Sequence, residues 1–237
     1  MKPYTNLWGE IMNRTTVIIK KLTIYLLGLF LLALGATFSI LAGIGVSPVT
    51  SLPYALELIT NVSVGVMTVI ANILFIIIQA ILLRQIDWKD FFIQFIISFI
   101  FGSFMDLTIW LTHGLPVNNS IWLIIVYLIL SLLIVSIGLL FYFTANLPTM
   151  PYDSLTNVIA NKWSMVFGKA KIMSDMLNVF ISLILCLVFI HSIGSIGIGT
   201  FIAAYGIGKI IGILLHKFQP PLSNWVLKSN TLNTLHE

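Results

Sequence analysis

Six long blocks of apolar residues constrain what this chain can fold into more than any other feature of its sequence. The blocks cover residues 22–43, 63–84, 90–111, 120–145, 168–190 and 195–217. Each is close to the roughly 20 residues that an α-helix needs to cross a bilayer. The apolar residues run continuously and do not follow an amphipathic pattern, so we expect lipid on most sides of each helix.

The same blocks decide the fold class. In lipid, every backbone N–H and C=O group must pair inside the protein, which leaves α-helices or a closed β-barrel. A barrel would show short segments of alternating polarity, and none occurs here. Only 8% of the residues are charged, against roughly a quarter in a soluble domain. The sequence therefore predicts an all-α membrane protein with six transmembrane helices.

The positions of the basic residues predict the orientation of these helices. Lys and Arg precede the first span, follow the sixth, and occur around the loops after spans two and four. The other three loops contain neither residue; they are 44–62, 112–119 and 191–194. Because positively charged loops stay in the cytoplasm, we predict a multi-pass protein of the bacterial cytoplasmic (plasma) membrane with both termini cytoplasmic.

The predicted organisation is one membrane domain with two polar ends. The domain covers residues 22–217, between a cytoplasmic segment, 1–21, and a cytoplasmic tail, 218–237. A short interfacial helix is expected around residues 7–19. The tail is polar after Pro221, and we expect it to be loosely ordered.

The membrane domain contains an internal repeat, with one unit at about 22–111 and the other at about 120–217. When the sequence is aligned with itself at an offset of 103 residues, identical residues coincide. They are Gly35 with Gly138, Phe38 with Phe141, Pro48 with Pro151, Ser51 with Ser154 and Gly65 with Gly168. Each unit has three spans, so the second must enter the membrane from the opposite side. Such inverted repeats are typical of secondary transporters, although duplication is also a simple way to build any stable bundle.

Each repeat unit has one segment that is interrupted by Gly and Pro. The backbone breaks are Gly43, Gly45 and Pro48 in the first unit, and Pro148 and Pro151 in the second. Short helices are expected after them, at about 48–60 and 151–162, because proline suits the first helical turn. Polar residues lie in or beside these segments, namely Thr50, Ser51, Asn146, Asp153 and Ser154. Paired breaks point to a transporter's binding site; the alternative is ordinary loops with interfacial helices.

Three motifs give the chain a resemblance to a known family. They are Gly43–Pro48 (sequence GIGVSP), Ser63–Gly65 and Gly102–Asp106. With these motifs the chain resembles the YczE/YitT-type bacterial integral membrane proteins over residues 22–217. It departs from them after the Ser-Pro pair, where Val49 and Thr50 replace a small residue and a Trp-Asp pair. The resemblance implies the membrane topology, and transport is the usual assumption for the family.

Ionisable residues inside the spans are the strongest candidates for a binding site, because they are costly in lipid and usually face a cavity or a partner. Asp175 lies about two turns into the fifth span, and its repeat mate is Asn72 in the second. Lys171 is four residues before Asp175, so both lie on one helix face. Asp153 is expected nearby, and Asp106 lies near the outer end of the third span. A structural ion pair is the alternative reading of Lys171 and Asp175.

These features favour a secondary transporter of a small polar solute. The buried carboxylates leave coupling to a proton or a cation open. The alternative is a non-transporting membrane subunit or an assembly partner of a larger membrane complex. No enzyme is predicted, because no Ser/His, Cys/His or His/Glu constellation occurs. We expect no metal site, no cofactor and no nucleic-acid partner. The expected partners are the lipid bilayer and an unidentified solute; a homo-oligomer or a membrane protein partner stays open.

Overall fold

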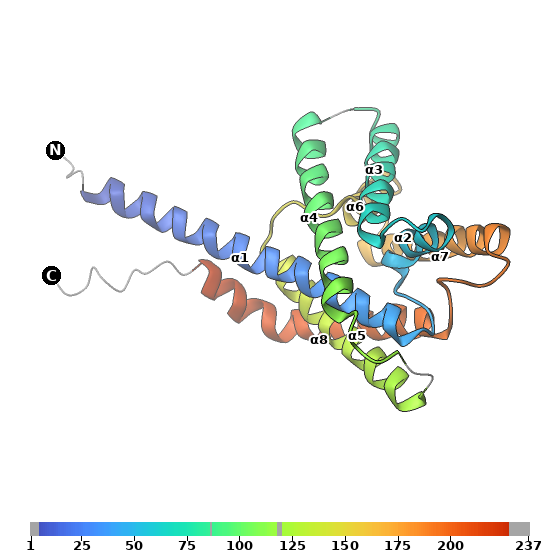
Figure 1. The fold of residues 1–237 in the computed structure, drawn as a ribbon. Coiled ribbons are helices and arrows are strands. Elements are labelled where there is room, and N and C mark those ends of the chain that lie inside the picture. The colour runs from blue at the N-terminus through green and yellow to red at the C-terminus, as the bar shows by residue number, and fades with distance from the viewer. Residues whose placement is uncertain (1–4, 86, 118–119, 228–237) are drawn as a thin grey trace.

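The structure, a computed structural model, describes residues 5–85, 87–117 and 120–227. These residues form eight α-helices and no strand (Figure 1). The helices are α1 (Thr5–Ala42), α2 (Pro48–Thr60), α3 (Val64–Leu83), α4 (Trp88–Thr112), α5 (Ile121–Thr144), α6 (Pro151–Lys162), α7 (Phe167–Phe189) and α8 (Ile198–Leu227). All but α2 and α6 are long and apolar enough to cross a membrane. The predicted all-α class with six spanning helices is therefore confirmed.

The two ends of the membrane domain differ from the prediction. Residues 7–19 do not form a separate interfacial helix, because α1 runs without a break from Thr5 to Ala42. Residues 222–227 are not loosely ordered, because α8 continues through Pro220 and Pro221 to Leu227. Its last turn is held against α1, where the Lys20 ammonium donates to the Trp225 carbonyl at 3.3 Å. The rest of the predicted tail, 228–237, lies outside the described residues.

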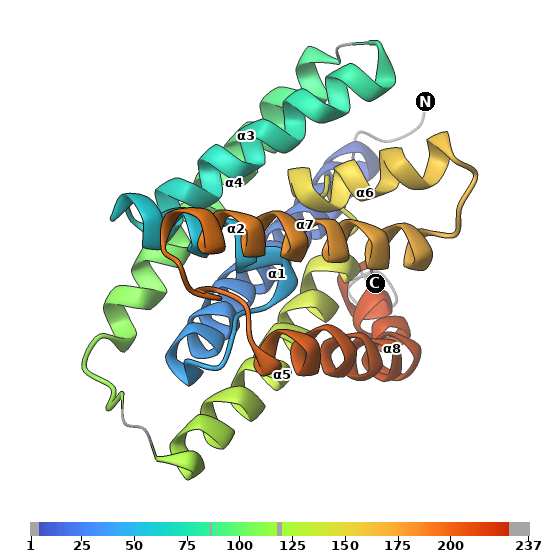
Figure 2. The same ribbon diagram turned by 90° about the vertical axis from the view of Figure 1, so that its right-hand side faces the viewer.

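Helices α1 and α5 cross at the centre of the molecule, and glycine makes their close approach possible (Figure 2). A Cβ atom on Gly28 would lie 2.7 Å from the Tyr142 backbone nitrogen. One on Gly138 would lie 2.9 Å from the Leu32 nitrogen. Small residues let helices pack closely in lipid, where van der Waals contact replaces the hydrophobic effect as the driving force. The crossing joins the two predicted repeat units.

Most helix contacts of one half have a counterpart in the other half. Helix α2 packs on α7 as α6 packs on α3, and α1 packs on α4 as α5 packs on α8. The clearest exception is the pair α3 and α4. Helices α3 and α4 run side by side, whereas α7 and α8 are not closely packed (Figures 1 and 2).

Glycine contacts show the same difference between the halves. A Cβ atom on Gly65 of α3 would lie 2.2 Å from the Gly102 carbonyl oxygen of α4. The repeat mate of Gly65 is Gly168, and a shift of 106 residues places Gly102 on Gly208. A Cβ atom on either of these two residues would have no neighbour within 4 Å. The glycine pair of the first half is thus in contact, whereas the corresponding pair of the second half is not.

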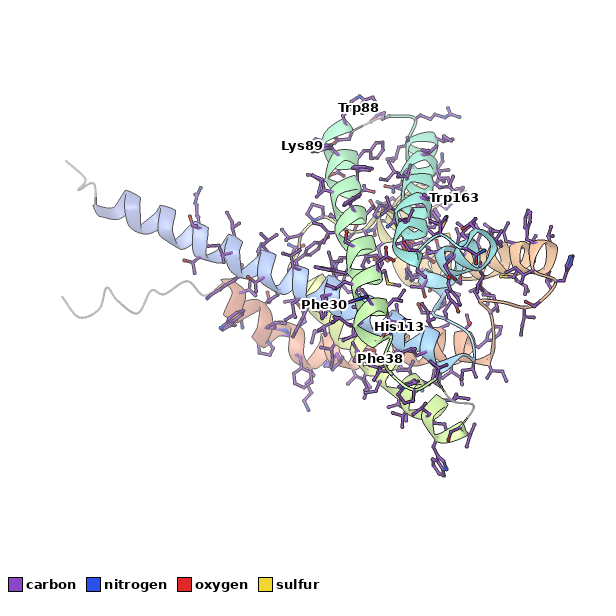
Figure 3. The ribbon with its side chains drawn as sticks, viewed as in Figure 1. Phe30, Phe38, Trp88, Lys89, His113 and Trp163 are labelled. Atoms are coloured by element: carbon purple, nitrogen blue, oxygen red, sulfur yellow. The ribbon has the colours of Figure 1, made fainter. Side chains whose placement is uncertain are left out.

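Helix α4 carries polar and aromatic residues at both ends. Trp88 and Lys89 lie at its first turn, and His113 follows its last (Figure 3). Trp88 and Trp163, the latter directly after α6, are both exposed. Exposed tryptophan near helix ends is typical of the membrane–water interface.

Candidate functional site

The first break lies between α1 and α2 and is held by the loop that precedes α8. Gly43 and Gly45 have φ angles of +68° and +108°, which favour glycine. A Cβ atom on Gly45 would lie 2.4 Å from the Gly197 nitrogen. The Val46 N–H donates to the Ser195 carbonyl at 3.0 Å, and the Gly199 N–H donates to the Ile44 carbonyl at 2.7 Å. This break is therefore an ordered connection between the halves.

The second break, between α5 and α6, is held by two tyrosines. Asn146 follows α5 in the left-handed region, with a φ angle of +49°. The Tyr25 hydroxyl donates to the Pro148 carbonyl at 2.7 Å, and the Met150 N–H donates to the Tyr142 hydroxyl at 2.6 Å. Asn146 and Pro148 are themselves exposed. Asn146 and Pro148 therefore belong to the turn between α5 and α6. Neither lies in the polar centre described below.

Pro48 and Pro151 begin the short helices α2 and α6, as the sequence predicts. Each proline carbonyl accepts an amide N–H from a span of the other half. Asn178 on α7 donates to Pro48 at 2.6 Å, and Gln79 on α3 donates to Pro151 at 3.1 Å. Since these prolines are repeat mates, the two short helices are anchored in corresponding ways.

The serines of the short helices continue these contacts. Ser51 is fully buried and accepts from the Ser182 hydroxyl at 3.1 Å. Ser154 accepts from the Gln94 amide at 3.2 Å. Gln94 also pairs with Gln79 at 3.0 and 3.3 Å. Both predicted serines therefore belong to hydrogen-bond networks that hold α2 and α6 between the spanning helices.

An ionic cluster connects α6 to α7. The Lys171 ammonium lies 3.2 Å from a carboxylate oxygen of Asp153 and 3.3 Å from one of Asp175. The Tyr152 hydroxyl donates to Asp175, and the Lys171 ammonium lies 4.1 Å from the centre of the Tyr152 ring. Burial and the neighbouring Asp175 raise the pKa of the Tyr152 phenol, which therefore stays a proton donor. The structure thus brings three predicted residues, Asp153, Lys171 and Asp175, into direct contact.

A small cavity of about 10 Å³ lies next to this cluster. Its polar lining comes from Thr50, Thr68 and Asn72, and the Tyr152 ring forms part of its wall. Such a volume holds about one water-sized sphere. Asn72 is only 5% exposed, and its amide makes no hydrogen bond to a described residue. Tyr152 belongs to both the cavity and the ionic cluster, and together they form the polar centre of the molecule.

Asp106 lies away from this polar centre. Its carboxylate accepts from the Ser63 hydroxyl at 2.7 Å and from the Gly65 N–H at 2.8 Å. These groups are at the first turn of α3, where N–H donors are free and the helix dipole favours a negative charge. Asp106 therefore links α4 to the start of α3 through hydrogen bonds.

This role predicts a modest effect of Asp106→Asn. The amide keeps one hydrogen bond but loses the charge interaction with the helix start, so we expect a loss of about 1 kcal/mol in unfolding free energy. Thermal unfolding of purified protein in detergent measures it, with Asp87→Asn at the start of α4 as a second capping residue for comparison. A solute-binding role for Asp106 would instead appear as lost binding at unchanged stability.

Several residues of the polar centre and of the hydrogen-bond networks that hold α2 and α6 were not predicted from the sequence. They are Tyr152, Asn178, Ser182, Gln79 and Gln94. Part of the signal was present, because Lys171, Asp175, Asn178 and Ser182 recur at helical spacing. A search for polar residues along one face of each apolar span would have found this α7 stripe.

The helices and the buried polar centre define a polytopic helical membrane protein. The model of a family of unknown function, DUF6198, matches residues 19–216, and the chain belongs to this family. It is similar to the uncharacterized protein YyaS of Bacillus subtilis (strain 168), with 27% identity over 208 residues, covering 87% of this chain and 96% of YyaS. No solved structure matches the chain. The comparisons name no YczE/YitT-type protein, so that resemblance stays a prediction.

Proposed function

We propose that this protein is a secondary transporter of a small polar solute in the bacterial cytoplasmic membrane, with both termini cytoplasmic. The observation that carries the proposal is the meeting of α2 and α6, the short helices that follow the two backbone breaks, at one buried polar centre. In secondary transporters the substrate and coupling ion bind where interrupted helices of two repeat units meet. The ionic cluster of Asp153, Lys171 and Asp175 is the proposed coupling group.

An inverted repeat is part of this proposal, and two kinds of contact support it. The short helices are anchored through corresponding proline carbonyls, Pro48 and Pro151. Most packed helix pairs also correspond between the halves; the exceptions are α3 with α4 and α1 with α8.

Alternating access requires the halves to differ in conformation at any moment. The packed Gly65–Gly102 contact and the open Gly168 and Gly208 positions supply such a difference. In the opposite state, α7 would approach α8 through Gly168 and Gly208 while α3 and α4 separate. Packed helix interfaces suit such a change, because they favour discrete arrangements.

Solute uptake into proteoliposomes tests the proposal. We expect Asp175→Asn to reduce uptake at least tenfold, because it removes a charge from the coupling group while keeping the shape of the side chain. Asp90→Asn, at an exposed position in the first turn of α4, should leave uptake unchanged. The screen would use radiolabelled amino acids, vitamins, nucleosides and sugars.

The proposal fails if reconstituted protein moves none of these solutes and Asp175→Asn leaves the cellular phenotype unchanged. A partner protein that co-purifies in fixed stoichiometry would then favour the alternative, a non-transporting subunit of a larger membrane complex.

A further inference from the structure

Three residues of the cavity and three residues of the ionic cluster occupy corresponding positions in the sequence. The shift of 103 residues places Thr50 on Asp153, Thr68 on Lys171 and Asn72 on Asp175. The first three residues line the cavity, and the other three are joined by ion pairs. The two halves thus build a polar trio from the same positions with different side chains.

In the second half, the trio already contains a cation. The Lys171 ammonium lies between the carboxylates of Asp153 and Asp175, at 3.2 and 3.3 Å. Its own helix, α7, supplies this charge on a flexible side chain. In the first half, the position of Lys171 is taken by Thr68, and the residues that line the cavity include no charged side chain.

The first-half trio provides oxygen ligands instead. The Thr68 hydroxyl donates to the Val64 carbonyl at 2.7 Å, which leaves its oxygen lone pairs unused by the described residues. The Thr50 hydroxyl donates to the Ser47 carbonyl at 3.1 Å and accepts from the Ser47 hydroxyl at 2.8 Å, which leaves one oxygen lone pair for a further contact. The Asn72 amide has no partner among the described residues, and its carbonyl oxygen is a third ligand.

A backbone carbonyl adds a fourth ligand. Pro53 lies inside α2 and has no N–H, so the carbonyl of Val49 cannot receive the usual helical hydrogen bond. Val49 and Pro53 both line the cavity. Carbonyl oxygens released by a break in a helix coordinate Na⁺ in transporters built from interrupted helices.

Size and charge select the ligand. A cavity of about 10 Å³ admits one particle no larger than water, which excludes an organic solute. The neighbouring cluster has two carboxylates for one ammonium, so the surrounding field favours a positive charge. Uncharged oxygen ligands suit a monovalent ion, whose desolvation is less costly than that of a divalent one.

We propose that this cavity binds one Na⁺ ion through Thr50, Thr68, Asn72 and the Val49 carbonyl. The ion takes the place in the first half that the Lys171 ammonium takes in the second. Its use as a coupling ion rests on the proposed transport function, whereas its binding does not. Tyr152 connects the two places, since its ring lines the cavity and its hydroxyl donates to Asp175.

Thermal unfolding of the purified protein in detergent tests the site, in sodium, potassium and choline chloride at equal ionic strength. A ligand that binds only the folded state raises its unfolding temperature. We expect a rise of several degrees in sodium over choline, with a smaller rise in potassium. Direct binding of radioactive sodium to the same protein should be saturable, with one ion per chain.

A matched pair of threonine variants locates the ion. Thr68→Val should abolish the sodium-dependent rise, and Thr68→Ser should keep it, because serine restores the hydroxyl oxygen. Thr144→Val is the control. Thr144 is likewise buried and donates only to the carbonyl four residues earlier, Leu140, at 2.6 Å, and its loss should leave the rise intact.

The site is overturned if the unfolding temperatures in sodium and choline agree and no sodium binds, because the cavity then holds water only. It is also overturned if Thr68→Val keeps the full rise. If sodium binds at this site but proteoliposomes move no solute, the ion site stands and the transporter proposal fails. If solute uptake occurs at the same rate in sodium and in choline and no sodium binds, the ion-site proposal fails and the transporter proposal stands.

Discussion

Replacing Lys171 with methionine should lower the free energy of unfolding by about 2–4 kcal/mol, because it leaves two carboxylates without their cation. The Asp153 side chain is only 7% exposed, so water cannot replace the lost ammonium there. Asp175 is 22% exposed and has the Tyr152 hydroxyl as a remaining donor. Most of the loss should therefore come from Asp153. Thermal or denaturant unfolding in detergent measures it.

A neighbouring lysine gives the control for this experiment. Lys169 is exposed on the first turn of α7, and Lys169→Met should change stability by less than about 0.5 kcal/mol. Adding Asp153→Asn to Lys171→Met should restore part of the loss, since the uncompensated charge is removed. If Lys171→Met proves as stable as Lys169→Met, the ion pairs make no net contribution to folding.

Alanine at Gly65 should destabilise the protein by about 1–3 kcal/mol, because α3 and α4 would have to move apart. The new Cβ atom would lie 2.2 Å from the Gly102 carbonyl oxygen and 2.5 Å from the Asp106 carboxylate. The backbone neighbour cannot rotate away as a flexible side chain can. Unfolding measurements in detergent on Gly65→Ala would show the loss.

The repeat mate of Gly65 gives an internal control. Gly168→Ala should be neutral or should stabilise α7 by up to about 1 kcal/mol, because alanine favours a helix and no atom lies within 4 Å of the new group. Equal losses at both positions would contradict the difference in packing between the halves. Reduced uptake by Gly168→Ala at unchanged stability would indicate that α7 closes on α8 during transport.

The sequence by itself determined the class of this protein. Apolar blocks near the length of a bilayer allow no other solution than helices, since backbone groups in lipid must pair internally. The two breaks were also visible, because Pro48 and Pro151 follow Gly or Asn residues that end the preceding helices. Lys171 and Asp175 were predicted to share a face from their spacing alone, since helical geometry fixes that relation locally.

Only the tertiary structure decided which polar residues meet. Asp153 reaches Lys171 from another helix, and Tyr152 joins this cluster to the cavity at Asn72. Asp106, which the sequence placed with the same candidates, caps α3 instead. Contacts between helices depend on their crossing angles and rotations, and continuous apolar blocks leave both undetermined because every face is compatible with lipid. Close packing at glycines such as Gly28 and Gly65 fixes them in the folded protein.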